Sequence, residues 1–193
     1  MERIYQGLPL RELGGDAGFR RPTQPSSERV TLESPALAVM TDFTRATPAT
    51  IRPQAPLAGA NQFMITRGVR LLLVVDDLEI VLGVITANDV LGERPMLAAT
   101  GRGVRRDELT VADVMTPVER VEVIKLAEVE RARVGHVLET LRRAGRQHAL
   151  VVGGTMVRGI FSISQIARQL GVSVPAGGEV ALTFSEIEAA LVK

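Results

Sequence analysis

Two apolar runs, 71–75 and 80–85, dominate the first half of the chain and are separated by the polar stretch 76–79. Short runs rich in Leu, Val and Ile and bounded by turn residues predict the two strands of a hairpin. After the second run the pattern changes to that of a helix, with Thr86 at the N-cap position. The strand-to-helix junction therefore places the Thr86 hydroxyl and the Asp89 carboxylate three residues apart.

Thr86 and Asp89 are open to two interpretations. As a ligand site, the Asp89 carboxylate would accept hydrogen bonds from a vicinal diol, and the free N–H groups of the helix start would hold an anion, which together suit a ribose phosphate. As a purely structural feature, Thr-x-x-Asp is a capping box whose acid only returns a hydrogen bond to the backbone.

The elements of the first half recur in the second half, in the same order and about 76 residues later. The recurring pairs are 40–41 with 115–116, Gly68 with Gly145, 74–76 with 151–153, and 83–86 with 159–162. Self-similarity at a near-constant spacing indicates a duplicated structural unit, with two halves that share one core.

Weaker patterns predict the remaining elements. Short strands are expected at 30–32, 47–51, 121–124, 149–152 and 156–161, and helices at 36–40, 56–66, 110–115, 131–144 and 185–191. Residues 1–29 show no sustained period and are expected to form a mobile arm.

Composition limits the classes of function. The 193 residues contain no cysteine, which excludes disulfides, thiolate catalysis and Cys-ligated zinc. Basic and acidic residues balance to a net charge of +1, so no general field attracts nucleic acid, and Arg105-Arg106 beside Asp107-Glu108 is expected to be a solvated ion-pair surface. No apolar run approaches the ~20 residues of a membrane span, and we expect a cytoplasmic protein without a membrane partner.

No arrangement of residues indicates catalysis. The two histidines, His136 and His148, lie on different predicted elements, and neither belongs to a recognisable hydrolase, metalloprotease or phosphate-loop pattern. Asp76 and Asp77 are expected to serve turn geometry, not to hold a metal. We expect no enzyme activity, no metal and no obligatory cofactor.

The duplicated order of elements, each copy ending in Gly-x-x-Thr or Gly-x-x-Ser before a helix, resembles a tandem pair of cystathionine β-synthase (CBS) domains, a Bateman module, over about residues 34–171. The resemblance implies an α+β (α/β-like) fold of two β-α-β-β-α repeats packed with pseudo-two-fold symmetry. The expected divisions are an arm at 1–29, repeat 1 at 30–98, a linker at 99–108, repeat 2 at 109–171 and a C-terminal extension with a short helix at 172–193.

The resemblance also implies a non-catalytic regulatory module that binds an adenine nucleotide such as AMP, ADP or ATP, mainly at the repeat 1 site. The residues expected to bind it are Thr47, Ala49, Arg70, Leu71, Leu72, Thr86 and Asp89 in repeat 1, and Gln147, His148, Ala149, Ser162 and Gln165 in repeat 2. Because Gln165 stands where the ribose-binding acid is expected, the second site should be weaker or empty. A homodimer and an unknown regulated protein are expected partners. The alternative is a ligand-free module for dimerisation or protein interaction.

Overall fold

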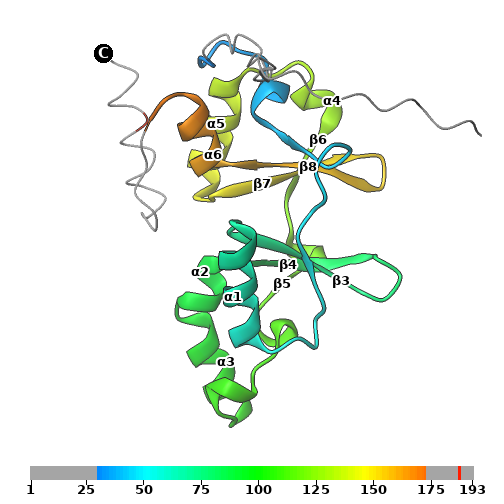
Figure 1. The fold of residues 1–193 in the computed structure, drawn as a ribbon, viewed down its shortest axis with the longest axis vertical. Helices are drawn as coiled ribbons and strands as arrows, with labels where there is room; N and C mark the ends of the chain where they lie inside the picture. Colours follow the sequence, from blue (N-terminus) through cyan, green and yellow to red (C-terminus); the bar gives the residue numbers. More distant parts are fainter. Residues whose placement is uncertain (1–29, 173–186, 188–193) are drawn as a thin grey trace, which may run out of the picture.

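Two four-stranded sheets face each other in the middle of the molecule, and helices cover the outer face of each (Figure 1). The computed structural model describes residues 30–172 and Ile187. The predicted α+β class, built as two similar halves, is confirmed.

The first half contains the sheet with strand order β2-β3-β4-β5. Its elements are β2 (Thr50–Ile51), α1 (Leu57–Arg67), β3 (Leu71–Val75), β4 (Val81–Thr86), α2 (Ala87–Leu91), α3 (Arg94–Arg102), the 3-10 helices η2 (Arg106–Glu108) and η3 (Val111–Asp113), and β5 (Thr116–Pro117). Strands β2 and β3 are parallel, and the other neighbours are antiparallel.

The second half repeats this arrangement in the sheet β1-β8-β7-β6. Its elements are the 3-10 helix η1 (Ala36–Val39), β1 (Thr41–Asp42), the 3-10 helix η4 (Val118–Arg120), β6 (Val123–Lys125), α4 (Leu126–Val129), α5 (Val134–Ala144), β7 (His148–Gly153), β8 (Met156–Ser162) and α6 (Ile163–Gln169). Strands β6 and β7 are parallel, whereas β7–β8 and β1–β8 are antiparallel.

The two halves exchange their edge strands. Strand β1 comes before all of the first sheet in the sequence, yet it pairs with β8, so that Thr41 lies opposite Ile160. Strand β5 comes after the first repeat and pairs back onto β4, so that Thr116 lies opposite Val84. Strand β1, which lies within predicted repeat 1, thus completes the second sheet. Strand β5, which lies within predicted repeat 2, completes the first sheet.

Matching glycines permit this exchange. A Cβ atom on Gly83 would lie 2.3 Å from the carbonyl oxygen of Thr116, and one on Gly159 would lie 2.6 Å from that of Thr41. Any side chain at these positions would force the exchanged strand away from its partner. The glycine of the repeated Gly-x-x-Thr/Ser motif therefore serves strand pairing.

Three apolar clusters hold the layers together. One lies between the first sheet and its helices, and includes Leu57, Met64 and Ile85. A second lies between η1, α5, α6 and the second sheet around the buried Phe161, and Ile187 packs into it. The third joins the facing surfaces of the two sheets through residues such as Leu73 and Leu150. The interface between the halves is thus itself an apolar core.

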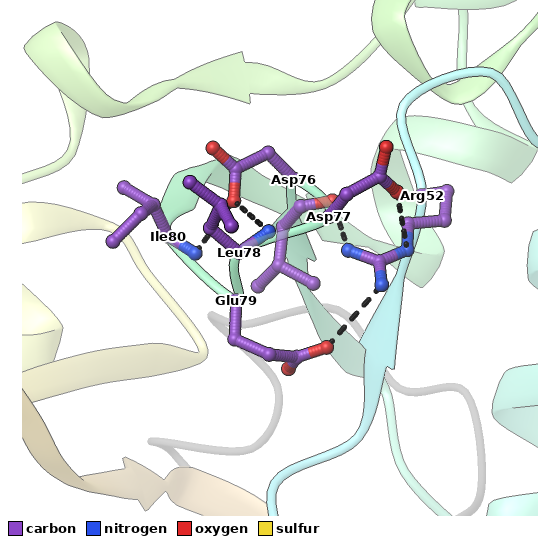
Figure 2. A network of polar contacts seen from close by, with 7 residues as sticks. Arg52, Asp76, Asp77, Leu78, Glu79 and Ile80 are labelled. Atoms are coloured by element: carbon purple, nitrogen blue, oxygen red, sulfur yellow. Dashed lines mark hydrogen bonds and ion pairs between the residues drawn. The ribbon is translucent and has the colours of Figure 1, made fainter.

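The β3–β4 hairpin ends in a tip ordered by backbone and carboxylate contacts (Figure 2). Asp76 Oδ1 accepts hydrogen bonds from the backbone N–H groups of Leu78 at 3.0 Å and Ile80 at 2.8 Å. The turn role expected for Asp76 is confirmed.

Arg52, just after β2, lies across the same tip (Figure 2). Its Nη2 atom is 3.4 Å from Glu79 Oε1, and its Nε atom is 3.7 Å from Asp77 Oδ1. Glu79 has a φ of 63°, the only positive φ of a non-glycine residue in the described part of the chain. The equivalent β7–β8 turn is shorter and has Gly154 in this conformation, with a φ of 60°.

Several elements differ from the sequence-based expectations. The strand expected at 30–32 is absent, because Leu32 instead gives its carbonyl to the N–H of Gly135 at the start of α5. The region expected to lead into a linker at 99–108 contains α3, since Pro95 is tolerated in the first helical turn. The helix expected at 131–144 begins at Val134.

The expected arm at 1–29 lies outside the described residues, as does the helix expected at 185–191 apart from Ile187, which is helical and buried. None of the helices that the structure describes has the length and apolar character to cross a bilayer.

Candidate functional site

Two of the cavities where the sheets meet contain predicted site residues. Cavity A has a volume of about 460 Å³ and contains Thr86 and Asp89, whereas cavity B has a volume of about 390 Å³ and contains Arg70 and Gln165. Both volumes are in the range that holds a small organic ligand. Leu71 and His148 line both cavities and so mark the boundary between them.

Each cavity combines the strand entry of one half with the helix start of the other. In cavity A, Gln147 and His148 at the entry of β7 face Thr86 and Asp89. In cavity B, Arg70 at the entry of β3 shares the lining with residues of the second half and of the segment before β2, namely Thr47, Ala49, Ser162 and Gln165. The expected grouping by repeat does not match the cavities, because the two-fold arrangement completes each cavity with residues of the opposite half.

Arg70, before β3, and Gln147, before β7, make the same backbone hydrogen bond in their two halves. The carbonyl of Arg70 accepts the N–H of Ala87 at 2.9 Å, and the carbonyl of Gln147 accepts the N–H of Ile163 at 3.0 Å. In both halves this bond ties the strand entry to the first residue of the following helix. Arg70 and Gln147 therefore occupy the same place in the fold, as do Asp89 and Gln165.

Asp89 is positioned by a capping box. Its Oδ2 accepts hydrogen bonds from Thr86 N at 2.9 Å and Thr86 Oγ1 at 2.7 Å. Its Oδ1 lies 2.8 Å from Arg94 Nη1, and its side chain keeps 13% exposure. Since each carboxylate oxygen has two acceptor positions, Oδ1 can accept a further hydrogen bond from a molecule in cavity A.

The Thr86 hydroxyl is committed within the capping box. It donates its proton to Asp89 and accepts the N–H of Asp89 at 3.2 Å. It can therefore donate to a phosphate only by releasing Asp89. The capping interpretation is confirmed as geometry, and cavity A remains open beside it.

Arginines supply the positive charge of cavity A. Arg94 pairs with Asp89 and donates to Thr116 Oγ1 at 3.0 Å, while Arg146 Nη2 lies 2.8 Å from Glu122 Oε2. Arg120 is exposed and has no polar partner within residues 30–172. These side chains can meet the phosphate of a ligand whose sugar lies at Asp89.

Gln165 in cavity B has a partner of its own. Its Oε1 accepts the Thr41 hydroxyl at 2.9 Å, so the amide can offer a ligand its N–H donors and one further acceptor position. Ser162 and Ser164 share a hydrogen bond at 3.0 Å. The amide is neutral and can both donate and accept, whereas the carboxylate at the equivalent position in cavity A is charged and only accepts.

Arg70 has an unsatisfied buried atom. Its Nε is fully buried and has no hydrogen-bond partner in the described structure, although buried donors are nearly always paired. Arg70 also lowers the pKa of His148. Burial first, and then the positive charge of Arg70, bring that pKa to about 4, so His148 is neutral at pH 7.

The two other expected residues lie apart from both cavities. Leu72 is fully buried in the first core, and Ala149 is part-buried against the second; neither side chain lines cavity A or B. Sequence reasoning missed the roles of Thr41, Thr116 and Arg94. The repeated Met-Thr pair was a usable signal for the two threonines, whereas Arg94 belongs to a helix that was not expected.

A second copy of the Asp89 geometry exists away from the cavities. Thr110 donates its N–H and its hydroxyl to Asp113 Oδ2 at 2.8 and 2.9 Å, and Arg102 pairs with the same carboxylate. The hydrogen bond from the Thr110 backbone is the largest contribution holding the pKa of Asp113 below its ordinary value. Asp113 lines neither cavity, so it has the capping geometry of Asp89 without a position at a ligand site. A substitution there can therefore serve as a control for the capping role alone.

Part of the chain matches a known domain family, and the fold matches solved structures. Residues 39–95 match the model of the CBS domain. No curated protein matches the chain. An uncharacterized conserved protein from Pyrococcus horikoshii is 19% identical with a TM-score of 0.56, over 77% of this chain and 100% of that chain.

Two ligand-bound structures share the fold. CBSX2 in complex with AMP is 18% identical with a TM-score of 0.53, over 70% of this chain and 94% of that chain. The CBS domain pair of protein MJ0100, in complex with 5′-methylthioadenosine and S-adenosyl-L-methionine, is 21% identical with a TM-score of 0.51, over 74% of this chain and 97% of that chain. The predicted resemblance to a tandem CBS-domain pair is confirmed.

Proposed function

We propose that this chain, whose residues 39–95 match the CBS domain and whose fold is that of a tandem CBS-domain pair, is a non-catalytic regulatory module that reversibly binds an adenine nucleotide. The ligand is AMP, ADP or ATP, and its principal site is cavity A. The adenosine-bearing ligands named for CBSX2 and MJ0100 support this class of ligand.

The observation that carries the proposal is the open side of Asp89. One oxygen of this carboxylate is fixed by Thr86, and the other faces a cavity of about 460 Å³ with an acceptor position to spare. A fixed carboxylate suits a ribose, because one of the sugar hydroxyls can donate to the acceptor position that Oδ1 keeps. Arg120 and Arg146 in the same cavity suit the phosphate.

Calorimetric titration of AMP, ADP and ATP into the wild type and Asp89→Asn tests the proposal. The amide keeps an oxygen for the capping box but loses the charge. We expect binding to weaken 10- to 100-fold, from the ~1.5–3 kcal/mol of a charge-assisted hydrogen bond.

Asp113→Asn is the matched control, since Asp113 has the same capping box and arginine partner outside the cavities. It should bind each nucleotide within twofold of wild type. Unchanged affinity in Asp89→Asn, or an equal loss in Asp113→Asn, contradicts the role of Asp89.

Both cavities lie at the seam between the sheets, so a ligand in either contacts the two halves at once. Such a ligand favours whichever relative position of the halves binds it more tightly, by its difference in affinity for the two. We propose that a partner protein senses this position.

Dimerisation is a second candidate function, favoured by apolar side chains on α1, α2 and α3. Ile65, Leu91 and Leu97 are exposed by 65%, 62% and 67%. Large apolar side chains exposed on neighbouring helices favour an interaction surface. We propose a homodimer through these helices. Light scattering should give twice the chain mass for wild type and the single mass for Ile65→Glu with Leu97→Glu; a monomeric wild type contradicts this.

A further inference from the structure

We propose that residues 4–10 of this chain dock in an apolar groove between the tips of the β3–β4 and β7–β8 hairpins. This surface, the hairpin groove, is lined chiefly by residues 78–81 of the first hairpin, residues 155–157 of the second, and Val118, Val121 and Val123 of the segment that links the halves. The inference concerns a different surface from the proposed function and does not depend on nucleotide binding.

The hairpin groove is separate from the cavities described above. The two hairpins project on the same side of the molecule (Figure 1), and the groove has a volume of about 560 Å³. Val84, Val121 and Leu150 line both the groove and cavity A, so they form the wall between them. A segment in the groove therefore contacts both halves of the molecule without entering cavity A.

The groove is apolar, and its apolar side chains face water. The exposed fractions of Leu78, Ile80 and Met156 are 82%, 58% and 70%. Among the described residues that line the groove, Glu79 alone is charged. Contact between water and large apolar side chains is unfavourable, and their grouping around one groove favours an occupant.

The sequence before Val30 contains a segment of matching character. Residues 4–10 include an isoleucine, a tyrosine and two leucines, and none of them is charged. Arg3 and Arg11 flank this run. An apolar run between two cations complements an apolar groove whose one charge, on Glu79, is negative.

The run is connected to the structure at a point from which it can reach the groove. Val30 packs against the outer core of the second half, and the carbonyl of Leu32 accepts the N–H of Gly135 at the start of α5. Residues 11–29 join the run to Val30 and can extend over ~60 Å. A compact body of this size is only ~40 Å across, so this connection is long enough to reach the hairpin tips.

The C-terminal segment fits the groove less well. Ile187 is buried in the cluster around Phe161, between the second sheet and its helices. The groove instead borders the facing surfaces of the two sheets, where Val84 and Leu150 lie. Burial of Ile187 therefore commits the C-terminal segment to the outer face of the second sheet.

Tyr5 gives a direct measurement of docking in the full chain, because it is the only tyrosine and the chain has no tryptophan. We expect acrylamide to quench Tyr5 fluorescence at least twofold less strongly in wild type than in Leu78→Lys with Met156→Lys, whose charges oppose docking. Ile65→Lys with Leu97→Lys is the matched control, because it changes the other exposed apolar surface; its quenching should equal that of wild type. Equal quenching in wild type and the groove variant overturns the inference.

Engineered cysteine pairs separate docking within one chain from docking onto a second copy, since the chain has no cysteine of its own. With a mild oxidant, Leu8→Cys with Met156→Cys should form a disulfide within one chain at least tenfold faster than Leu8→Cys with Arg143→Cys. Arg143 is exposed on α5, the helix beside which the chain enters the structure, so a long connection reaches it without docking. Equal rates overturn the inference, as does a product of twice the chain mass, which assigns the groove to a second copy.

Melting temperatures confirm that each variant is folded, and the substituted groove residues are exposed. Neither experiment contains a nucleotide, so failure of docking is distinguishable from failure of the proposed function.

Discussion

Cavity A and cavity B carry different side chains at equivalent positions. At the strand entry, cavity A has the amide of Gln147 and cavity B has the guanidinium of Arg70. At the helix start, cavity A has the carboxylate of Asp89 and cavity B has the amide of Gln165. Both positions are fixed by the same backbone hydrogen bonds and the same strand exchange. The duplicated backbone therefore fixes the positions from which side chains reach each cavity. Two side chains per cavity differ, and with them the charge, the donors and the acceptors that the cavity offers.

The largest expected effect tests the shared scaffold. Gly83→Ala should lower the free energy of unfolding by about 3 kcal/mol, because its Cβ would overlap a backbone oxygen that cannot move alone. Gly159→Ala should cost slightly less, about 2 kcal/mol, since its overlap is smaller.

Urea denaturation measures both glycine variants. Gly59→Ala in α1 is the control, because nothing lies within 4 Å of its Cβ and alanine favours a helix. It should be neutral or stabilising. A cost below 1 kcal/mol in both motif glycines would mean that the exchanged strands can shift freely.

His148, which lies between the cavities, should make stability depend on pH. Its pKa of about 4 in the folded protein lies below the ~6.5 of an unfolded histidine, so the unfolded state takes up the proton first as the pH falls. The contribution of neutral His148 to the free energy of unfolding is therefore fully present above pH ~6.5. It is lost as the pH falls from ~6.5 to ~4, by up to about 3 kcal/mol.

Urea midpoints at pH 7 and 4.5 measure this loss in wild type and His148→Gln. The charged groups that line the two cavities with His148 are Arg70, Asp89, Arg94, Arg120, Glu122, Arg146 and Arg168, so only the difference between the two proteins is assigned to His148. His136→Gln, at an exposed position on α5, should behave as wild type. Equal losses in wild type and His148→Gln would show that His148 does not titrate in this way.

Gln165→Glu should make cavity B resemble cavity A. The added carboxylate keeps an acceptor for Thr41 but repels phosphate, and we expect tripolyphosphate to bind about tenfold more weakly, equivalent to ~1.4 kcal/mol. Calorimetry on Gln169→Glu, on the same helix but outside the cavity, controls for net charge; an equal loss there would assign the effect to the general field.

The smallest expected change in stability comes from substitutions in the β3–β4 and β7–β8 hairpin turns. Gly154→Ala should cost about 1 kcal/mol, because alanine is strained at a φ of 60°. Glu79→Gly should change stability by less than ~0.5 kcal/mol, since relief of the same strain is offset by a more flexible unfolded chain and the lost Arg52 contact. Thermal melting measures both. A Glu79→Gly loss as large as that of Gly154→Ala would show that the Arg52 network outweighs the strain.

The sequence predicted the duplication, the hairpins and the pairing of Thr86 with Asp89 because these depend on local periods and repeated motifs. It did not predict which residues meet across the cavities. That depends on how two sheets face each other, and nothing local to Arg70 indicates that its neighbours are Ser162 and Gln165 from the other half. The helix α3 was missed because Pro95 and Gly101 read as chain breakers, although proline is compatible with a first helical turn.

The exchanged strands also bear on how the chain is made. During translation β1 emerges early, but its partner β8 is completed only when Ile160 and Gly159 leave the ribosome. Until then Thr41 and Asp42 have no strand to pair with, and the closure of so long a loop is slow. The nascent chain can therefore complete the first sheet once β5 has emerged, whereas the second sheet must wait for the β7–β8 hairpin.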